Sequence, residues 1–258
     1  MMIFERYNYD FRSYARSSLR RRLSTAMVKF GMPTMVEIKE RANEDVDFFL
    51  GLLQYLTVPT SEMFRDPQVF QTFRERAVPV LRTYPSLRFW IAGCSTGEEL
   101  YSYAILLHEE GLLEKTTFYA TDINPVSLKK AEQGFFPTDR MKLYSTNYQK
   151  SGGKTTLSDY FSVGYDSAMI DKALRRNVVF ADHSLATDSV FGEMQVVSCR
   201  NVMIYFNKDL QDRALGLFHE SLCFGGFLVV GSKETLRFSR WDHRFSEFSK
   251  YDRIYQRK

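Results

Sequence analysis

Residues 89–99 read Phe-Trp-Ile-Ala-Gly-Cys-Ser-Thr-Gly-Glu-Glu, and this segment sets the architecture expected for the chain. An apolar run ends in a Gly-x-x-x-Gly loop, and a helical pattern of apolar residues begins directly after it. A strand, a glycine turn and a helix N-terminus in this order form the crevice where nucleotide-like ligands bind in open α/β sheets. Many strand-to-helix turns contain glycine, so the loop alone is a weak indication of a ligand site, and the neighbouring residues are needed to identify the ligand.

Acidic residues around the turn narrow the class of ligand. A second apolar run, 118–121, ends at Asp122, where a carboxylate suits the two hydroxyls of a ribose. Asn124 is the better helix cap, which would leave the Asp122 carboxylate free at the strand tip. Glu98 and Glu99 would repel a pyrophosphate and attract a positively charged nucleoside that carries an amino acid. The acids therefore favour S-adenosylmethionine over a dinucleotide.

Composition bounds the class of protein. The chain has 258 residues, 44% of them hydrophobic and 15% aromatic, which is enough for a packed core and excludes global disorder. The net charge of +4 does not by itself indicate nucleic acid as a partner. Residues 1–42 hold nine Lys/Arg against four Asp/Glu, a local balance of +5, so the rest of the chain is close to neutral. This excess indicates either a solvated helix face or a surface for an acidic macromolecule.

Cysteine usage and hydropathy indicate the compartment. Cys94, Cys199 and Cys223 are isolated, with neither a disulfide framework nor zinc spacing, so no metal is expected. The N-terminus carries charges and no apolar segment of the kind found in signal peptides. No run approaches the roughly 20 apolar residues of a membrane span. We therefore expect a cytoplasmic protein that is not itself embedded in a membrane.

Residues 1–80 are predicted to form an N-terminal all-helical domain and a linker. Apolar residues at three-to-four spacing predict a first helix over 11–30, with Arg12, Arg16 and Arg20 on one face. Three further helices are predicted here: one after the capping box Thr34–Glu37, one over about 45–56, and one from Pro67 with Asp66 as its N-cap.

Residues 81–258 alternate strands with helices, which predicts an α/β domain with a doubly wound, mostly parallel sheet. Residues from about 135 to 172 are polar and rich in turns, and we interpret them as a small inserted subdomain. The expected elements are strand 88–92, helix 98–110, strand 117–121, helix 125–133, strands 178–181 and 195–199, helix 208–222, and strands 227–230 and 251–255.

Two further groups of polar residues are candidates for the same crevice. Arg200 and Asn201 directly follow a predicted strand, so they fall at its carboxyl end, and Tyr205 lies near the mouth. Packing between strand and helix is the alternative role for Tyr205. Arg65 lies in the linker, where a lone arginine is more often a surface ion-pair residue.

Four segments together resemble the CheR-type chemotaxis receptor methyltransferases, a family of Rossmann-like S-adenosylmethionine-dependent enzymes. Each would be a weak signal alone, but they occur in the family's order and the similarity covers nearly the whole chain. The resemblance implies methyl transfer from S-adenosylmethionine to receptor glutamates, with S-adenosylhomocysteine as the second product. The matching segments are Glu62–Asp66, Ala92–Glu99, Ala120–Ile123 and Cys199–Phe206.

The same resemblance implies the roles of individual residues. Arg65 and Tyr205 match the family's active-site arginine and tyrosine. Ser61 replaces a threonine and keeps its hydroxyl. Pro59 stands where many members have an asparagine that touches the cofactor, and Ser184 replaces an asparagine on the adenine side. The implied cofactor-binding residues are Ser61, Arg65, Glu99, Asp122, Ser184, Leu185, Asn201 and Val202.

The implied partner is the cytoplasmic helical domain of chemoreceptors, which is rich in glutamate and would meet the basic face of Arg12, Arg16 and Arg20. A non-catalytic module that binds the cofactor or its product in a chemosensory-like pathway is the alternative function, motivated by Pro59 and Ser184. A nucleic-acid methyltransferase is disfavoured because the segment after the strand lacks an Asn/Asp-Pro-Pro-aromatic signature. A dehydrogenase is disfavoured because the full Gly-x-Gly-x-x-Gly is missing.

Overall fold

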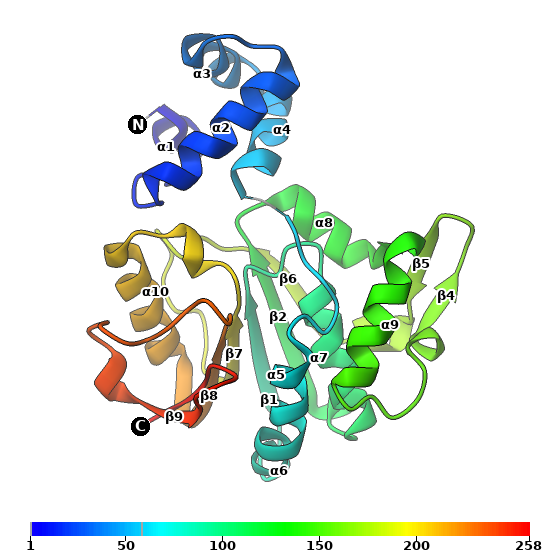
Figure 1. Cartoon of the computed structure of the whole chain (residues 1–258). Coiled ribbons are helices and arrows are strands. Elements are labelled where there is room, and N and C mark those ends of the chain that lie inside the picture. The colour runs from blue at the N-terminus through cyan, green and yellow to red at the C-terminus, as the bar shows by residue number, and fades with distance from the viewer. Residues whose placement is uncertain (1, 58) are drawn as a thin grey trace.

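The computed structural model describes residues 2–57 and 59–258, and its helical N-terminal part stands at one end of an α/β body (Figure 1). Apolar faces of the N-terminal helices meet in a cluster of their own, which includes Ala26, Phe49 and Leu56. Thr34 caps the third of these helices, because its side chain accepts a hydrogen bond from the Glu37 backbone N–H at 3.3 Å. The helices are α1 (Met2–Tyr7), α2 (Arg16–Phe30), α3 (Met35–Glu44) and α4 (Val46–Thr57).

A seven-stranded sheet forms the centre of the body, in the order β6-β2-β1-β7-β8-β10-β9. The first five strands in this order run parallel, whereas β10 is antiparallel to both of its neighbours. The chain order reverses between β1 and β7, which is the switch point where such sheets bind ligands. The strands are β1 (Leu87–Ala92), β2 (Thr116–Asp122), β6 (Val178–Asp182), β7 (Met194–Cys199), β8 (Leu222–Val230), β9 (Phe245–Ser249) and β10 (Ile254–Arg257).

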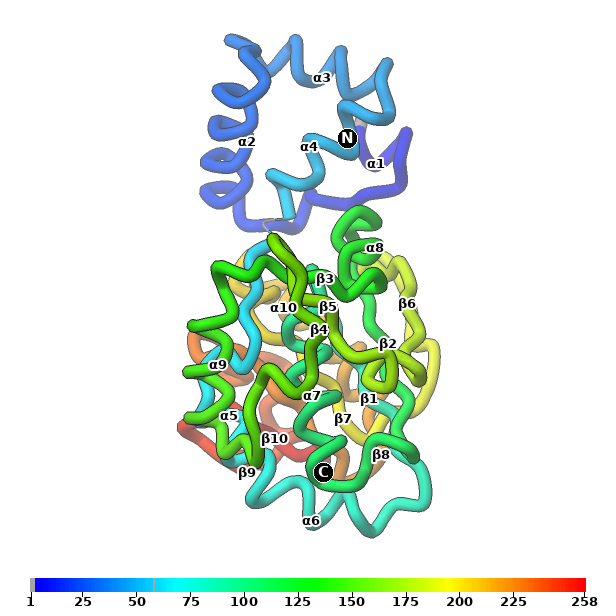
Figure 2. Tube along the Cα trace, turned by 90° about the vertical axis from the view of Figure 1, so that its right-hand side faces the viewer, coloured from blue at the N-terminus to red at the C-terminus, as the bar shows by residue number. Residues whose placement is uncertain are grey.

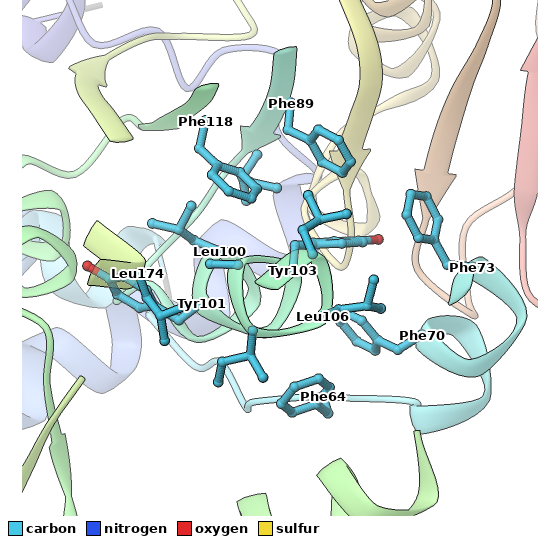
Figure 3. Packing of buried hydrophobic residues seen from close by; sticks show 14 of the residues in the cluster. Phe64, Phe70, Phe73, Phe89, Leu100, Tyr101, Tyr103, Leu106, Phe118 and Leu174 are labelled. Carbon is cyan, nitrogen blue, oxygen red and sulfur yellow. The ribbon is translucent and has the colours of Figure 1, made fainter. Parts of the chain in front are cut away.

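Helices cover both faces of the sheet, as alternation along β1 requires. Phe89 packs in the cluster that contains α7, whereas Trp90 packs on the opposite face in the cluster that contains α10. Figure 3 shows aromatic side chains, Phe70 and Tyr103 among them, gathered around α7. The helices are α5 (Pro67–Thr72), α6 (Val78–Leu81), α7 (Glu98–Glu109), α8 (Pro125–Gln133) and α10 (Lys208–Ser221).

Residues 135–172 form a small sheet and a helix beside the main sheet (Figures 1 and 2). The strands β3 (Phe135–Pro137), β5 (Ser167–Ile170) and β4 (Phe161–Val163) pair antiparallel in that order. Helix α9 (Met141–Lys150) binds the linker, since Asn147 Nδ2 donates to the Met63 carbonyl at 3.1 Å.

The first predicted helix begins later than the apolar spacing indicates, at Arg16. Residues 13–15 instead pair with residues 205–207 of the α/β body: Ala15 N–H donates to the Tyr205 carbonyl at 2.8 Å, and Asn207 N–H donates to the Ser13 carbonyl at 2.9 Å. The prediction that Arg12 shares a helix face with Arg16 and Arg20 was therefore wrong. Arg12 lies in the preceding loop and forms an ion pair with Asp10 at 2.7 Å.

Two other predictions need correction. Asp66 precedes α5 as expected, but its side chain makes no capping hydrogen bond and instead accepts one from Arg200 at 2.9 Å. The last strand starts at Ile254 rather than at residue 251, because residues 251–253 form a turn that returns the chain from β9. Strand β9 has little apolar alternation in its sequence and was not predicted.

Candidate active site

The glycine turn joins the carboxyl ends of β1 and β2. Gly93 and Cys94 donate their backbone N–H groups to the Thr121 carbonyl at 2.8 and 2.9 Å. Gly93 has φ +76°, and a Cβ built on it would lie 2.5 Å from Val202 Cγ2. Gly97, with φ +95°, immediately precedes α7 and lies against Ala131 of α8. Close approach and positive φ together explain why the turn requires glycine.

A cavity of about 950 Å³, including the part open to solvent, lies above this turn. It is bounded by the strand ends of the main sheet, the linker before α5, and the N-terminal helical part. The lining residues are Tyr14, Arg22, Thr57, Pro59, Thr60, Ser61, Glu62, Arg65, Gly93, Ser95, Glu99, Asp122, Ile123, Ser127, His183, Leu185, Arg200, Asn201, Val202, Tyr205 and Phe206.

Asp122 lies at the tip of β2 and lines the cavity, but its carboxylate is not free as predicted. One oxygen accepts a hydrogen bond from Ser95 N–H at 2.8 Å and the other from Asn124 N–H at 2.9 Å. Asn124 does cap α8, as expected. A carboxylate has about four lone-pair positions, so Asp122 keeps acceptor capacity toward the cavity. Burial raises the pKa of Asp122 to about 6, and the two backbone hydrogen bonds oppose that rise.

Glu99, in the first turn of α7, is held by two partners. Its carboxylate accepts from Ser198 Oγ at 2.7 Å and from Arg200 Nη1 at 3.4 Å. Burial raises the pKa of Glu99, while the positive charges of Arg200 and Arg65 act in the opposite direction. The Glu99 carboxylate therefore lines the cavity in a position that its hydrogen bonds to Ser198 and Arg200 fix.

Arg200 ties three chain segments together beneath the cavity. Its side chain is only 1% exposed, and Nη2 donates to Asp66 Oδ2 at 2.9 Å and to the Arg65 carbonyl at 2.7 Å. With the contact to Glu99, this guanidinium joins the linker, α7 and the segment after β7. The backbone of Arg65 is thereby fixed while its side chain faces the cavity.

Glu234 supports the segment that follows β7. Its carboxylate accepts from the backbone N–H groups of Asn201 at 2.9 Å, Ile204 at 3.2 Å and Gly231 at 2.6 Å. Asn201 has φ +61°, a conformation that needs such support. Glu234 was missed by sequence reasoning, because nothing in its neighbourhood indicates contact with residues 201–204.

The N-terminal part supplies residues to the cavity that sequence reasoning also missed. Tyr14 and Arg22 line it, and the Arg22 guanidinium lies 4.0 Å from the centre of the Tyr205 ring. The spacing of apolar residues in the sequence could have predicted that Arg22 is buried. Arg22 stands three residues after Leu19 and four before buried Ala26, so it shares the apolar face of α2.

The structure gathers the implied cofactor residues around one cavity, with one exception. Ser184 does not line it. Its N–H donates to Asp188 Oδ2 at 2.8 Å and its Oγ accepts from Ala186 N–H at 3.3 Å, which closes a local turn. The neighbouring His183 lines the cavity instead. Those that do line the cavity are Ser61, Arg65, Glu99, Asp122, Leu185, Asn201 and Val202, and the implied active-site residue Tyr205 lines it as well.

Comparison with known proteins places the chain. The family described as CheR methyltransferase, SAM binding domain, matches residues 59–251. A protein of Pseudomonas putida that carries the name "Putative methyltransferase Cher3" is 56% identical over 99% of this chain and 93% of its own length. A chemotaxis protein methyltransferase of Listeria monocytogenes is 28% identical over 88% of this chain and 84% of its own length.

Among solved structures, a TehB-like SAM-dependent methyltransferase of Corynebacterium glutamicum aligns with a TM-score of 0.39 at 14% identity. The alignment covers 71% of this chain and 85% of that one. The fold is assigned from the strand order described above and not from this alignment.

The parallel sheet with its switch point, the acidic cavity and the matched SAM-binding domain together identify an S-adenosylmethionine-dependent methyltransferase. The matched region and the 56% identity are specific enough to go further: the chain belongs to the CheR methyltransferase family.

The donor set fits S-adenosylmethionine, since acidic side chains at Glu99 and Asp122 flank a turn that Gly93 keeps open. Within residues 2–57 and 59–258, no group of three His, Cys, Asp or Glu side chains is placed to hold a metal ion. No helix in the same residues is long and apolar enough to cross a membrane.

We expect Gly93→Ala to weaken binding of S-adenosylhomocysteine at least about tenfold, because the added Cβ collides with Val202 and strains a positive-φ backbone. Isothermal calorimetry measures the affinity. Gly111→Ala is the matched control, since Gly111 has φ +67° but open space around its Cβ position. Equal affinity for the two variants would contradict a role of Gly93 in shaping the cavity.

Cofactor affinity should fall as the pH drops through about 6, the raised pKa of Asp122. Above this pH the carboxylate is ionised and accepts hydrogen bonds from ribose hydroxyls; below it, protonation removes the charge. One unit below the midpoint, affinity should be reduced by up to about tenfold. Calorimetry from pH 5 to pH 8 tests this. The Asp122→Asn variant should show a flat profile, and a wild-type slope retained in that variant would exclude Asp122 as its source.

Proposed function

We propose that this protein transfers the methyl group of S-adenosylmethionine to glutamate side chains of chemoreceptor-type proteins and forms glutamyl methyl esters. The observation that carries the proposal is the Arg65 guanidinium, which lines the cofactor cavity and makes no ion pair among the described residues. A cation at this position suits a carboxylate acceptor. The CheR family membership and a relative named chemotaxis protein methyltransferase support the same class of acceptor.

Methyl transfer to a carboxylate requires no proton transfer by the protein. A glutamate carboxylate has an ordinary pKa of about 4.3 and is already ionised at neutral pH, so no general base is required. When bound, S-adenosylmethionine supplies a methyl carbon bonded to a positively charged sulfur. A carboxylate oxygen forms a bond to that carbon as the carbon–sulfur bond breaks, and the electron pair stays on sulfur. The protein's task is to place the carboxylate in line.

Arg65 is well supported for such placement. Its carbonyl is bound by Arg200, and the preceding residue, Phe64, donates its N–H to Ser102 Oγ at 2.8 Å. Phe64 and Asp66 on either side have φ +51° and +53°, so the linker follows one defined path. A fixed backbone holds the guanidinium over the cavity at a small cost in conformational entropy. Tyr205 faces the same space and could steer the same carboxylate.

A non-catalytic binding module is not favoured. Ser184 lies outside the cavity lining, so its departure from the family pattern removes no group that faces the ligand. Pro59 does line the cavity, at the linker. The two departures leave Arg65, Glu99 and Tyr205 in place.

We predict that Arg65→Ala lowers kcat/KM for methyl transfer to a receptor fragment by about 100-fold or more, because a paired, charge-assisted contact to the acceptor is lost. Arg65→Lys should recover only part of it, since an ammonium lacks the planar fork. Radiolabelled methyl incorporation measures turnover, and calorimetry measures cofactor affinity separately. Full turnover of Arg65→Ala would remove this residue from the reaction.

The receptor partner is proposed to dock on α2. Arg16 and Arg20 are exposed one turn apart and line a shallow surface groove with Arg21. Arg12, which is paired with Asp10 outside the helix, no longer belongs to this face. Chemoreceptor cytoplasmic domains rich in glutamate would be attracted by these charges.

Turnover on a receptor fragment should therefore fall with rising salt, as opposite charges are screened. The double reversal Arg16→Glu/Arg20→Glu should lower kcat/KM about tenfold at low salt and flatten the salt dependence. The matched control is Lys29→Glu/Lys39→Glu, which changes the net charge equally at exposed positions of α2 and α3. Rates measured between 20 mM and 500 mM salt that respond equally in the two variants would exclude α2 as the docking face.

A further inference from the structure

Arg22 is a buried cation on the wall of the active-site cavity. It belongs to α2, is 4% exposed, and lines the cavity together with Tyr205. Its Nη1 donates to the Leu56 carbonyl at the end of α4, and its guanidinium stacks on the Tyr205 ring at 4.0 Å. The N-terminal helical part thus places a positive charge beside a residue of the methyl-transfer site.

Apart from the Tyr205 ring, the rest of this guanidinium has no partner. Its Nε and Nη2 make no hydrogen bond, and no carboxylate is paired with it among residues 2–57 and 59–258. Arg200, which is buried to a similar degree, instead binds both Asp66 and Glu99. Burying a charge without an opposite charge is costly, and burial lowers the pKa of Arg22 accordingly. A cation kept in this state points to an anion that arrives with a ligand.

The position of Arg22 distinguishes between the two carboxylates that the reaction brings together. Glu99, near which the amino-acid end of the cofactor is expected, has Arg200 and Arg65 as its cationic neighbours. The charged or polar neighbours of Arg22 are Tyr205 of the segment after β7, and Tyr14 and Arg21 of the helical part. Arg22 is therefore not among the cations that act on Glu99, and it lines the part of the cavity wall that α2 supplies.

We propose that Arg22 binds the carboxylate of the methyl-accepting residue, so that one oxygen of that carboxylate faces Arg22 while Arg65 holds the other. This inference rests on the proposed function and adds a substrate-binding residue from outside the α/β body. Cation–π stacking on Tyr205 holds the guanidinium in place before the acceptor arrives.

Charge selection follows from this arrangement. An ionised carboxylate neutralises Arg22 and offsets its repulsion of a positively charged sulfur nucleoside. A methyl ester or a glutamine side chain carries no charge and leaves Arg22 without a partner. The site should therefore bind the unmethylated acceptor in preference to the product, which favours product release.

The test compares Arg22→Met and Arg22→Lys with the wild type on a receptor fragment that carries a glutamate acceptor. Arg22→Met keeps the apolar stem and removes the charge. We expect kcat/KM to fall about 10–100-fold, the range for a lost charged hydrogen bond, while affinity for S-adenosylhomocysteine changes less than about twofold. Arg22→Lys should restore part of the rate, and added guanidinium ion should partly rescue Arg22→Met. Lys29→Met, an exposed charge removal on the same helix, should behave as the wild type.

A binding measurement separates substrate recognition from a structural role. With S-adenosylhomocysteine present, the wild type should bind the glutamate fragment more tightly than the same fragment with glutamine, and Arg22→Met should lose that preference. Unchanged discrimination, or an equal loss of cofactor affinity in Arg22→Met, would overturn the proposal. If the wild type methylates no receptor glutamate, the proposed function fails first, and that result is distinct from a failure confined to the variants.

Discussion

The connection between the ends of β1 and β2 is the constraint on which the site depends. Gly93 and Cys94 donate to the Thr121 carbonyl, and Ser95 donates to the Asp122 carboxylate. These bonds hold the turn in a conformation that only a residue without Cβ adopts beside Val202. The same geometry directs Asp122 to the cavity and starts α7 with Glu99 at its edge. The binding surface is therefore a consequence of backbone hydrogen bonding at the switch point.

A second constraint joins the separate parts of the chain around that turn. Arg200 binds the linker through the Arg65 carbonyl and Asp66, while residues 13–15 pair with residues 205–207. Gln54 Nε2 also donates to Asn124 Oδ1, which connects α4 to the cap of α8. The helical part is thus held against the active site by polar contacts at several points. This explains how a residue of α2 reaches the methyl-transfer site.

Predictions from the sequence were correct for features that depend only on residues close together in the chain. The Thr34 and Asn124 caps were predicted correctly because a cap acts within two or three residues. The position of Asp122 was also correct, but its partners were not, since they depend on how the turn after β1 folds back. Asp66 shows the same limit: its place before α5 was predicted, but its bond to Arg200 joins segments far apart in the chain.

Spacing and composition were sufficient to establish the alternating α/β body, the glycine turn and the acids beside it, because those features arise from local periodicity and from steric needs of single residues. Only the tertiary structure determines which residues distant in the chain are in contact, such as Arg22 with Tyr205 and Glu234 with Asn201. It also determines that Ser184 lies outside the cavity lining. The physical reason is that a buried polar group takes whichever partner the packed elements bring within hydrogen-bond reach. Separation along the chain carries little information about that partner.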